Sequence, residues 1–169
     1  GMLVSALANA KVEEAIAAYT ASGVPRELIV EADTVGAACD ALVAGKRVVM
    51  ADPRLLARLD HLDIITDATW SPVIGAEVAN ACIQHGKDIV LINIEADVTV
   101  GRILKKLAVE AGVLYSVSSG DEPGCLMELH DFVSTLGYEV IAIGKGKSNP
   151  LNPAATPESV LESARKSDK

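Results

Sequence analysis

The sequence predicts an α/β fold built on a mostly parallel sheet with helices on both faces. Short apolar runs of strand length alternate along the chain with helical patterns of roughly 10–15 residues. Half of the residues are hydrophobic and only 3% are aromatic, so the core is aliphatic, which suits helices packed on a parallel sheet. Residues 89–92 are all apolar and too few for a helix, which is typical of a strand buried on both faces.

Composition excludes several classes of protein. The formal net charge of −8 argues against nucleic acid or an anionic membrane as the main partner. No apolar run reaches the roughly 18 residues that span a bilayer, and no signal-peptide pattern is present. Cys39, Cys82 and Cys125 are widely spaced and odd in number, which indicates buried thiols in a reducing compartment. We therefore expect a cytoplasmic protein.

The first part of the chain contains two strand–helix units. Residues 3–8 form a strand that ends at Asn9, and a helix follows whose apolar face consists of Val12, Ala15, Ile16 and Tyr19. Thr34, preceded by Asp33, is a typical N-cap for a second helix. Gly45 ends that helix, and residues 47–51 form the next strand.

The middle of the chain contains the central strand. A short helical segment at residues 53–59 precedes a strand at 64–67. Pro72 suits the first turn of a helix that runs to Gly86. The strand that follows includes residues 89–92 and, past Asn93, extends to Ile94.

The remaining elements follow the same alternation. After Asp97, an amphipathic helix ends at Gly112, and its buried stripe is Val100, Ile103, Leu104, Leu107, Ala108 and Ala111. A strand at 113–117, a helix at 126–136, a strand at 140–143 and a short helix at 160–164 complete the chain.

Polar residues follow the central strand directly. Open α/β sheets bind ligands outside the carboxyl ends of their strands, where Asn93, Glu95 and Asp97 lie. Asp97 alone is explained equally well as the cap of the next helix. Glu95 and Asp97 together favour a site, because two carboxylates at this position call for a metal, a substrate or a helix start.

Two further segments carry candidate site residues. The segment 120–124 has the Gly and Pro content of a turn, but Asp121 and Glu122 lie at the same sheet edge as Glu95, which favours a functional role. Lys145 and Lys147 lie between glycines and are suited to hold a phosphate or carboxylate, although exposed lysines are also common.

The ends of two other strands are candidate cofactor sites. Asp67-Ala68-Thr69 ends the strand 64–67, and Trp70 beside it is interpreted as a lid or packing residue. Asn9 stands where a dinucleotide-binding fold reads the adenosine ribose. An acidic residue there would favour NAD, and the neutral Asn is compatible with NADP.

Three segments together resemble the predicted homoserine dehydrogenase-like oxidoreductases, a group that includes the deoxyxylulose-phosphate reductoisomerase-like enzymes. These are Asp67-Ala68-Thr69, residues 85–97 and residues 120–124. Members join an N-terminal NAD(P)-binding Rossmann domain to a catalytic domain, often with a C-terminal SAF domain. This sequence departs from the group in three ways: Ile94 replaces the Lys of true homoserine dehydrogenases, and neither an SAF region nor a G-x-G-x-x-G turn is present.

The resemblance implies roles for the candidate residues. NADP, or NAD, would lie near four of them: Asn9, Ala68, Thr69 and Asn93. The carboxylates would hold the substrate or a divalent metal, with the two lysines nearby: Glu95, Asp97, Asp121, Glu122, Lys145 and Lys147. Glu95 and Asp121 are the expected metal ligands.

The resemblance also implies a Rossmann-like fold that is missing its first βα unit. Residues 1–97 would be a truncated NAD(P)-binding domain, and residues 98–169 the end of its sheet and the start of the catalytic domain. The missing strand would lie between residues 3–8 and 64–67. We expect the full-length protein to be an NAD(P)-dependent oxidoreductase, as a homo-oligomer, acting on a small hydroxylated or phosphorylated metabolite. The alternatives are a non-catalytic nucleotide- or metabolite-binding module and an inactive truncated product.

Overall fold

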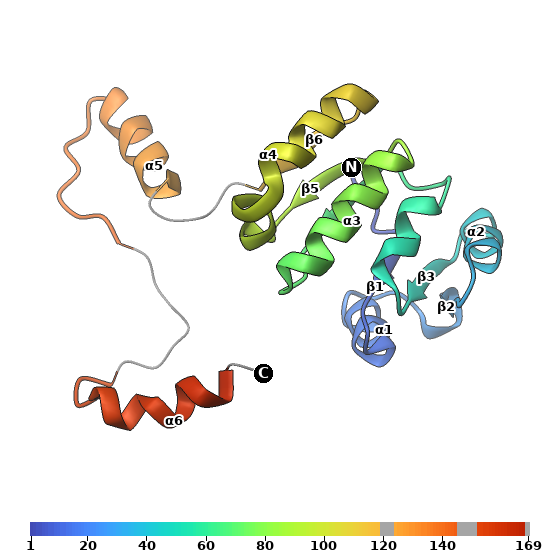
Figure 1. Ribbon diagram of the computed structural model, residues 1–169, viewed down its shortest axis with the longest axis horizontal. Helices are drawn as coiled ribbons and strands as arrows, with labels where there is room; N and C mark the ends of the chain where they lie inside the picture. The colour runs from blue at the N-terminus through green and yellow to red at the C-terminus, as the bar shows by residue number, and fades with distance from the viewer. Residues whose placement is uncertain (119–123, 145–151, 168–169) are drawn as a thin grey trace. The chain divides into compact units, whose positions relative to one another are not determined.

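The computed structural model describes residues 1–118, 124–144 and 152–167, which form parts of two compact units, residues 1–118 and 119–169 (Figure 1). The elements of the first unit are β1 (Ala6–Ala8), α1 (Val12–Ala21), the 3₁₀ helix η1 (Arg26–Leu28), β2 (Ile29–Glu31), α2 (Val35–Val43), β3 (Arg47–Met50), the 3₁₀ helix η2 (Pro53–Arg58), β4 (Ile64–Asp67), α3 (Pro72–Gln84), β5 (Asp88–Leu91), α4 (Ile94–Ala111) and β6 (Tyr115–Val117). The second unit contains α5 (Gly124–Thr135) and α6 (Pro157–Ser167).

The first unit has the predicted α/β architecture. Its strands form two parallel three-stranded sheets, in the orders β1-β3-β2 and β4-β5-β6. The register places Leu7 opposite Val49 in the first sheet and Ile65 opposite Ile89 in the second. All pairings are parallel, and the connections within each sheet carry helical structure, as in βαβ units: β1 to β2, β2 to β3, β4 to β5 and β5 to β6.

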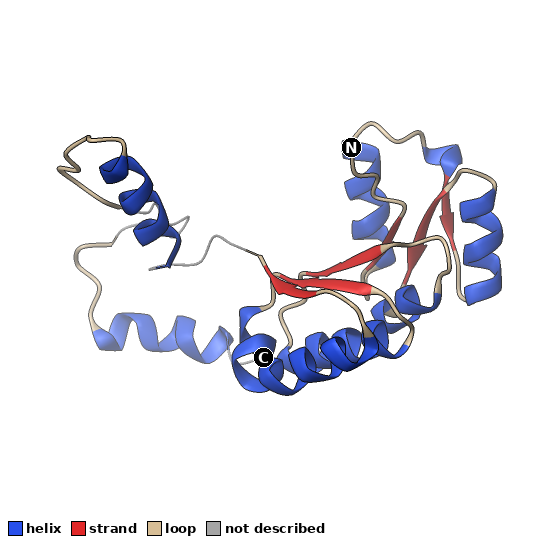
Figure 2. Cartoon of the chain, turned by 90° about the horizontal axis from the view of Figure 1, so that it is seen from above, coloured by secondary structure: helices blue, strands red, loops and turns tan. Residues whose placement is uncertain are grey.

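Helices cover both sides of the first sheet. Val48 and Met50 face a large core shared with α2, α3 and α4, whereas Val49 faces a smaller core under α1. This division follows from the two-residue period of a strand, which sends alternate side chains to opposite faces. The large core also contains Ile89 and Leu91, so one continuous apolar layer joins the two sheets. Figure 2 shows α3 and α4 lying along one face of the β4-β5-β6 sheet.

β1 and β4 each pair with one strand only in the described part of the chain. β1 pairs with β3, and β4 pairs with β5. The two strands between which the sequence analysis places a missing strand are therefore not paired with each other. An unpaired strand edge exposes backbone N–H and C=O groups that can accept another strand.

Several predicted boundaries need correction. The strand expected at 140–143 is wrong: none of these residues forms a ladder, and Ile141 is 91% exposed. A lone apolar segment without a partner strand gains neither ladder hydrogen bonds nor packing. Ile94 begins α4 and does not continue β5. The strand of the second strand–helix unit, β2, was predicted without bounds, because three residues carry no visible alternation. Among the described residues, no helix is long and apolar enough to cross a membrane.

Candidate functional site

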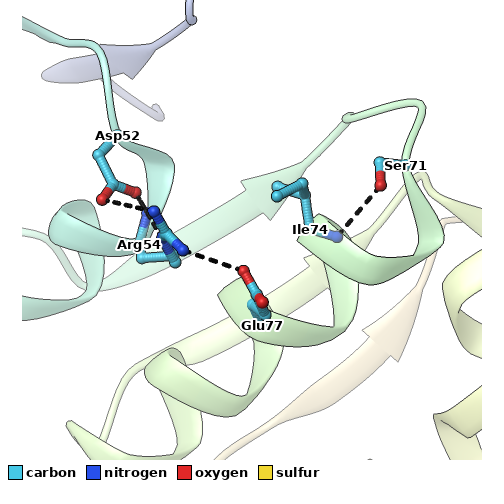
Figure 3. Close-up of polar contacts among 5 residues, drawn as sticks. All are labelled: Asp52, Arg54, Ser71, Ile74 and Glu77. Atoms are coloured by element: carbon cyan, nitrogen blue, oxygen red, sulfur yellow. Dashed lines mark hydrogen bonds and ion pairs between the residues drawn. The ribbon is translucent and has the colours of Figure 1, made fainter.

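The loop between β4 and α3 is fixed at both ends. At its start, Oδ1 of Asp67 accepts a hydrogen bond from the backbone N–H of Thr69 at 3.1 Å. At its end, Oγ of Ser71 accepts one from the N–H of Ile74 at 3.3 Å and caps α3 (Figure 3). Pro72 occupies the first turn, where its missing N–H costs no helical hydrogen bond. Both anchors arise from local side chains and set the path of residues 68–70.

Asn93 connects this loop to the end of β5. Its side-chain amide donates to Oγ1 of Thr69 at 3.1 Å and to the backbone carbonyl of Ser71 at 2.9 Å. Its Oδ1 accepts from the N–H of Ala96 at 3.0 Å, so Asn93 is the N-cap of α4. The interpretation of Asp97 as that cap is therefore wrong, since Asp97 lies inside the first turns of the helix. Asn93 is only 2% exposed, and both of its donors are used within the protein.

Gly75 lets α3 approach these two side chains closely. A Cβ atom at position 75 would lie 2.5 Å from Nδ2 of Asn93 and 2.7 Å from Oδ2 of Asp67. Asp67 is 3% exposed, and its Oδ2 has no hydrogen-bond partner among the described residues. A buried carboxylate oxygen without a partner is costly and unusual in a native protein. Asp67, Asn93 and Gly75 thus form a tight polar cluster under the loop.

The nearby thiol of Cys82 is not a nucleophile. Burial, with a smaller contribution from the Asp67 carboxylate, raises the pKa of Cys82 to about 12. The thiolate is the reactive form of cysteine, and at neutral pH this side chain stays protonated. Cys82 is part of the core, as the sequence analysis expects.

The two carboxylates after β5 have different surroundings. Glu95 is exposed in the first turn of α4. Oδ1 of Asp97 accepts a hydrogen bond from the hydroxyl of Tyr115 at 2.7 Å, which ties α4 to β6. Gly101 makes room for this arrangement, because a Cβ there would lie 2.8 Å from Cγ of Asp97. Burial, and then the Asp97 hydrogen bond, raises the pKa of Tyr115 well above its usual range, so the hydroxyl remains a donor. Glu95 is the carboxylate free to meet a ligand.

The sequence analysis missed a row of ion pairs that joins η2 to α3. Arg54 in η2 binds both oxygens of Asp52, at 2.8 and 3.0 Å, and reaches Oε2 of Glu77 in α3 at 3.2 Å (Figure 3). The hydrogen bond from Arg54 lowers the pKa of Asp52. The three side chains are about half exposed, so these ion pairs add little to stability. Their main effect is to hold η2 against α3. The charge spacing of 23 residues between Arg54 and Glu77 offers no local sequence signal.

Asn9 follows β1 and begins the turn into α1. Its Oδ1 accepts from the N–H of Lys11 at 2.9 Å, and its amide contacts Glu14 at 3.4 Å. The first of these contacts is a local turn that Asn and Asp side chains both make. Asn9 is half-buried, so one face of the side chain is accessible to a ligand.

The structure therefore brings together only part of the predicted site. Asp67, Ala68, Thr69 and Asn93 lie at the carboxyl ends of β4 and β5, and Glu95 follows two residues after Asn93 in the first turn of α4. Asn9 follows β1 in the other sheet, and Asp97 is engaged by Tyr115. Four predicted residues lie outside the described residues: Asp121, Glu122, Lys145 and Lys147. Within the described residues, no group of three or more His, Cys, Asp or Glu side chains is placed to hold a metal ion. A metal shared by Glu95 and Asp121 stays a prediction.

Trp70 lies in the centre of the fixed loop and is 98% exposed. Its interpretation as a packing residue is wrong for the described part of the chain. The exposure of Trp70 has no local sequence signal, because a lone tryptophan next to Ser-Pro looks the same whether buried or exposed.

The family comparison points to the second unit. Residues 120–169 match the family model "Oxidoreductase DRL, catalytic domain". The matched residues fall within the compact unit 119–169. No curated protein matches the chain. The match supports an oxidoreductase role for this protein.

Proposed function

We propose that the protein is an NAD(P)-dependent oxidoreductase of the homoserine dehydrogenase-like or reductoisomerase-like kind, acting on a small hydroxylated or phosphorylated metabolite. The observation that carries the proposal is the match of residues 120–169 to an oxidoreductase catalytic domain, in a chain whose other unit is a parallel α/β fold. Parallel α/β sheets bind ligands outside the carboxyl ends of their strands, and the fixed loop 67–71 lies there.

The residues of the first unit are better suited to bind the ribose of a dinucleotide than its pyrophosphate. The loop that begins at Asp67 is held by hydrogen bonds to Asp67 and Asn93, with Ala68 exposed and Thr69 half-buried. We assign Asn9, which follows β1, to the ribose. Asp67 and Asn93 are positioning residues that orient this loop. The sequence contains no G-x-G-x-x-G turn, so the backbone cradle that such a turn gives a pyrophosphate is not supplied by these residues.

The proposed chemistry divides between the cofactor and the chain. Nicotinamide supplies or receives the hydride when it is bound. Glu95 is the exposed carboxylate beside the loop, and we assign it to the substrate or to a divalent metal together with Asp121. Asp97 and Glu122 would help to hold the substrate or the metal. Lys145 and Lys147 would neutralise a phosphate or carboxylate of the substrate. We also expect a homo-oligomer without nucleic-acid or membrane partners.

The second candidate is a non-catalytic module that binds a nucleotide or metabolite at the same sheet edge. The observation in its favour is that Asp97, a predicted catalytic carboxylate, has one oxygen engaged by Tyr115. Such a module would bind the dinucleotide but would not catalyse its oxidation or reduction.

Cofactor preference tests the proposal at Asn9. Asn9→Asp preserves the acceptor for the N–H of Lys11. It also replaces the amide donor 3.4 Å from Oε2 of Glu14 with a second carboxylate oxygen, so thermal unfolding of the variant is measured alongside. The new carboxylate should repel a 2′-phosphate and accept hydrogen bonds from a free ribose. We expect the ratio of NADPH to NADH affinity to fall about tenfold, which is the effect of roughly one unfavourable charge contact.

The affinities are measured by NMR titration of the full chain, with Asn9→Ser as the control that keeps a turn acceptor without a charge. An unaltered ratio in Asn9→Asp would show that residue 9 does not face the ribose. Failure of the wild-type chain to bind either dinucleotide would remove the support for a nicotinamide cofactor.

A further inference from the structure

The indole of Trp70 is the most exposed large side chain on a firmly held segment of the first unit. It is 98% exposed and is the single tryptophan of the chain. A tryptophan that packs usually buries about 150–250 Å² of surface and dominates the contacts around it. Full exposure of such a ring forgoes that burial, and aromatic side chains presented in this way are typical of ligand and partner contacts.

The backbone on both sides of Trp70 is held by buried groups. Thr69 is bound through its N–H by Asp67 and through its hydroxyl by Asn93. Ser71 is bound through its carbonyl by Asn93, and its hydroxyl caps α3. Asp67 and Asn93 are 3% and 2% exposed. The ring is thus mounted on a pre-organised loop, which lowers the entropy that a ligand must remove on binding.

The position of the loop selects the part of a dinucleotide that the ring would meet. Doubly wound sheets bind a dinucleotide across two mononucleotide-binding halves, and the adenosine ribose lies beside the residue that follows an early strand, here Asn9 after β1. In that arrangement, β4 and β5 would belong to the other half, which receives the nicotinamide mononucleotide.

We propose that Trp70 stacks on the nicotinamide ring of a dinucleotide bound at the carboxyl ends of β4 and β5. This inference rests on the proposed function and adds a specific contact to it. Flat rings stack on aromatic side chains with little need for directional hydrogen bonds, and the oxidised nicotinamide also carries a positive charge that the electron-rich indole face attracts. The contact therefore favours the oxidised cofactor over the reduced one.

The single indole N–H gives one resonance that reports on this contact in the full chain, even when binding is weak. The probes are NADP⁺ and NADPH. Titration should shift the indole signal and produce intermolecular Overhauser effects between indole and nicotinamide protons. Trp70→Ala should weaken NADP⁺ binding about tenfold and NADPH binding less, whereas Trp70→Phe should retain most of the affinity.

Val73→Ala is the matched control, because Val73 is an apolar residue in the first turn of α3, just after the loop, and is 64% exposed. It should leave both affinities unchanged. If the wild-type chain binds neither dinucleotide, the proposed function itself fails. If it binds but the indole signal stays in place and Trp70→Ala binds equally well, the stacking contact alone is refuted. Overhauser effects to the adenine ring, with equal losses for NADP⁺ and NADPH, would overturn the assignment to nicotinamide.

Discussion

Replacing Gly75 with alanine should destabilise the first unit by about 3 kcal/mol, the upper part of the usual range for overpacking a tight core. The new methyl group would lie 2.5 Å from Nδ2 of Asn93, 2.7 Å from Oδ2 of Asp67 and 3.1 Å from Cβ of Ala96. Asp67 and Asn93 are almost fully buried, so neither can swing into solvent. Either α3 moves away from β4 and β5, or Asn93 loses its hydrogen bonds to the loop.

Urea unfolding followed by circular dichroism measures this loss on the full chain. Gly36→Ala is the control, since Gly36 is also in a helix but a Cβ there meets nothing within 4 Å. That change should be neutral or stabilise by up to about 1 kcal/mol through helix propensity. Equal stability of the two variants would show that α3 does not approach Asp67 and Asn93 as closely as described.

Replacing Glu95 with glutamine should lower turnover by roughly 10²-fold, provided that this carboxylate serves the reacting centre. Glu95 is exposed in the first turn of α4 and needs no partner for folding. Its favourable interaction with the helix N-terminus is worth only about 0.3–1 kcal/mol. A role at the reacting centre therefore predicts a large loss of turnover, whereas a role at the helix N-terminus predicts only a small loss of stability.

Oxidation of NADPH in the presence of small hydroxylated and phosphorylated carbonyl compounds supplies the rate, and thermal unfolding of the same samples supplies the stability. Glu110→Gln is a matched change in the last turn of the same helix, where Glu110 is exposed and only 3.9 Å from Lys106. It should leave turnover unchanged. Similar rates for both variants would assign Glu95 to the helix surface, whereas a complete lack of turnover by the unmodified chain would favour the binding module.

Much of the first unit follows from patterns within single segments. The boundaries of β4 are those predicted, because its run is bounded by turn residues. The cap of α2 at Thr34 was also predicted, and its hydroxyl accepts from the N–H of Ala37 at 3.2 Å. Such features depend on a few adjacent residues, and a local pattern is enough to reveal them.

The rest depends on contacts between segments, which a single sequence does not display. Ile94 looks like the end of a strand, yet Asn93 before it caps α4 because the loop at 69–71 gives its amide two acceptors. Gly75 and Gly101 look like ordinary helix glycines, although a Cβ at either position would collide with a side chain from another segment or the preceding turn: Asn93 and Asp67 at Gly75, and Asp97 at Gly101. Gly75 marks the polar cluster that positions the loop at 67–71, and Gly101 marks the contact between Asp97 and Tyr115.

The most direct test of a dinucleotide at the carboxyl ends of β4 and β5 is an NMR titration of the isotopically labelled chain with NADPH, read from its backbone amides. The largest shifts should fall on residues 67–71 and Asn93. Because the sequence offers no glycine-rich turn for the pyrophosphate, the dissociation constant should be no lower than about millimolar, a binding free energy of about −4.1 kcal/mol. Shifts confined to other surfaces, or saturation at micromolar NADPH, would contradict the account.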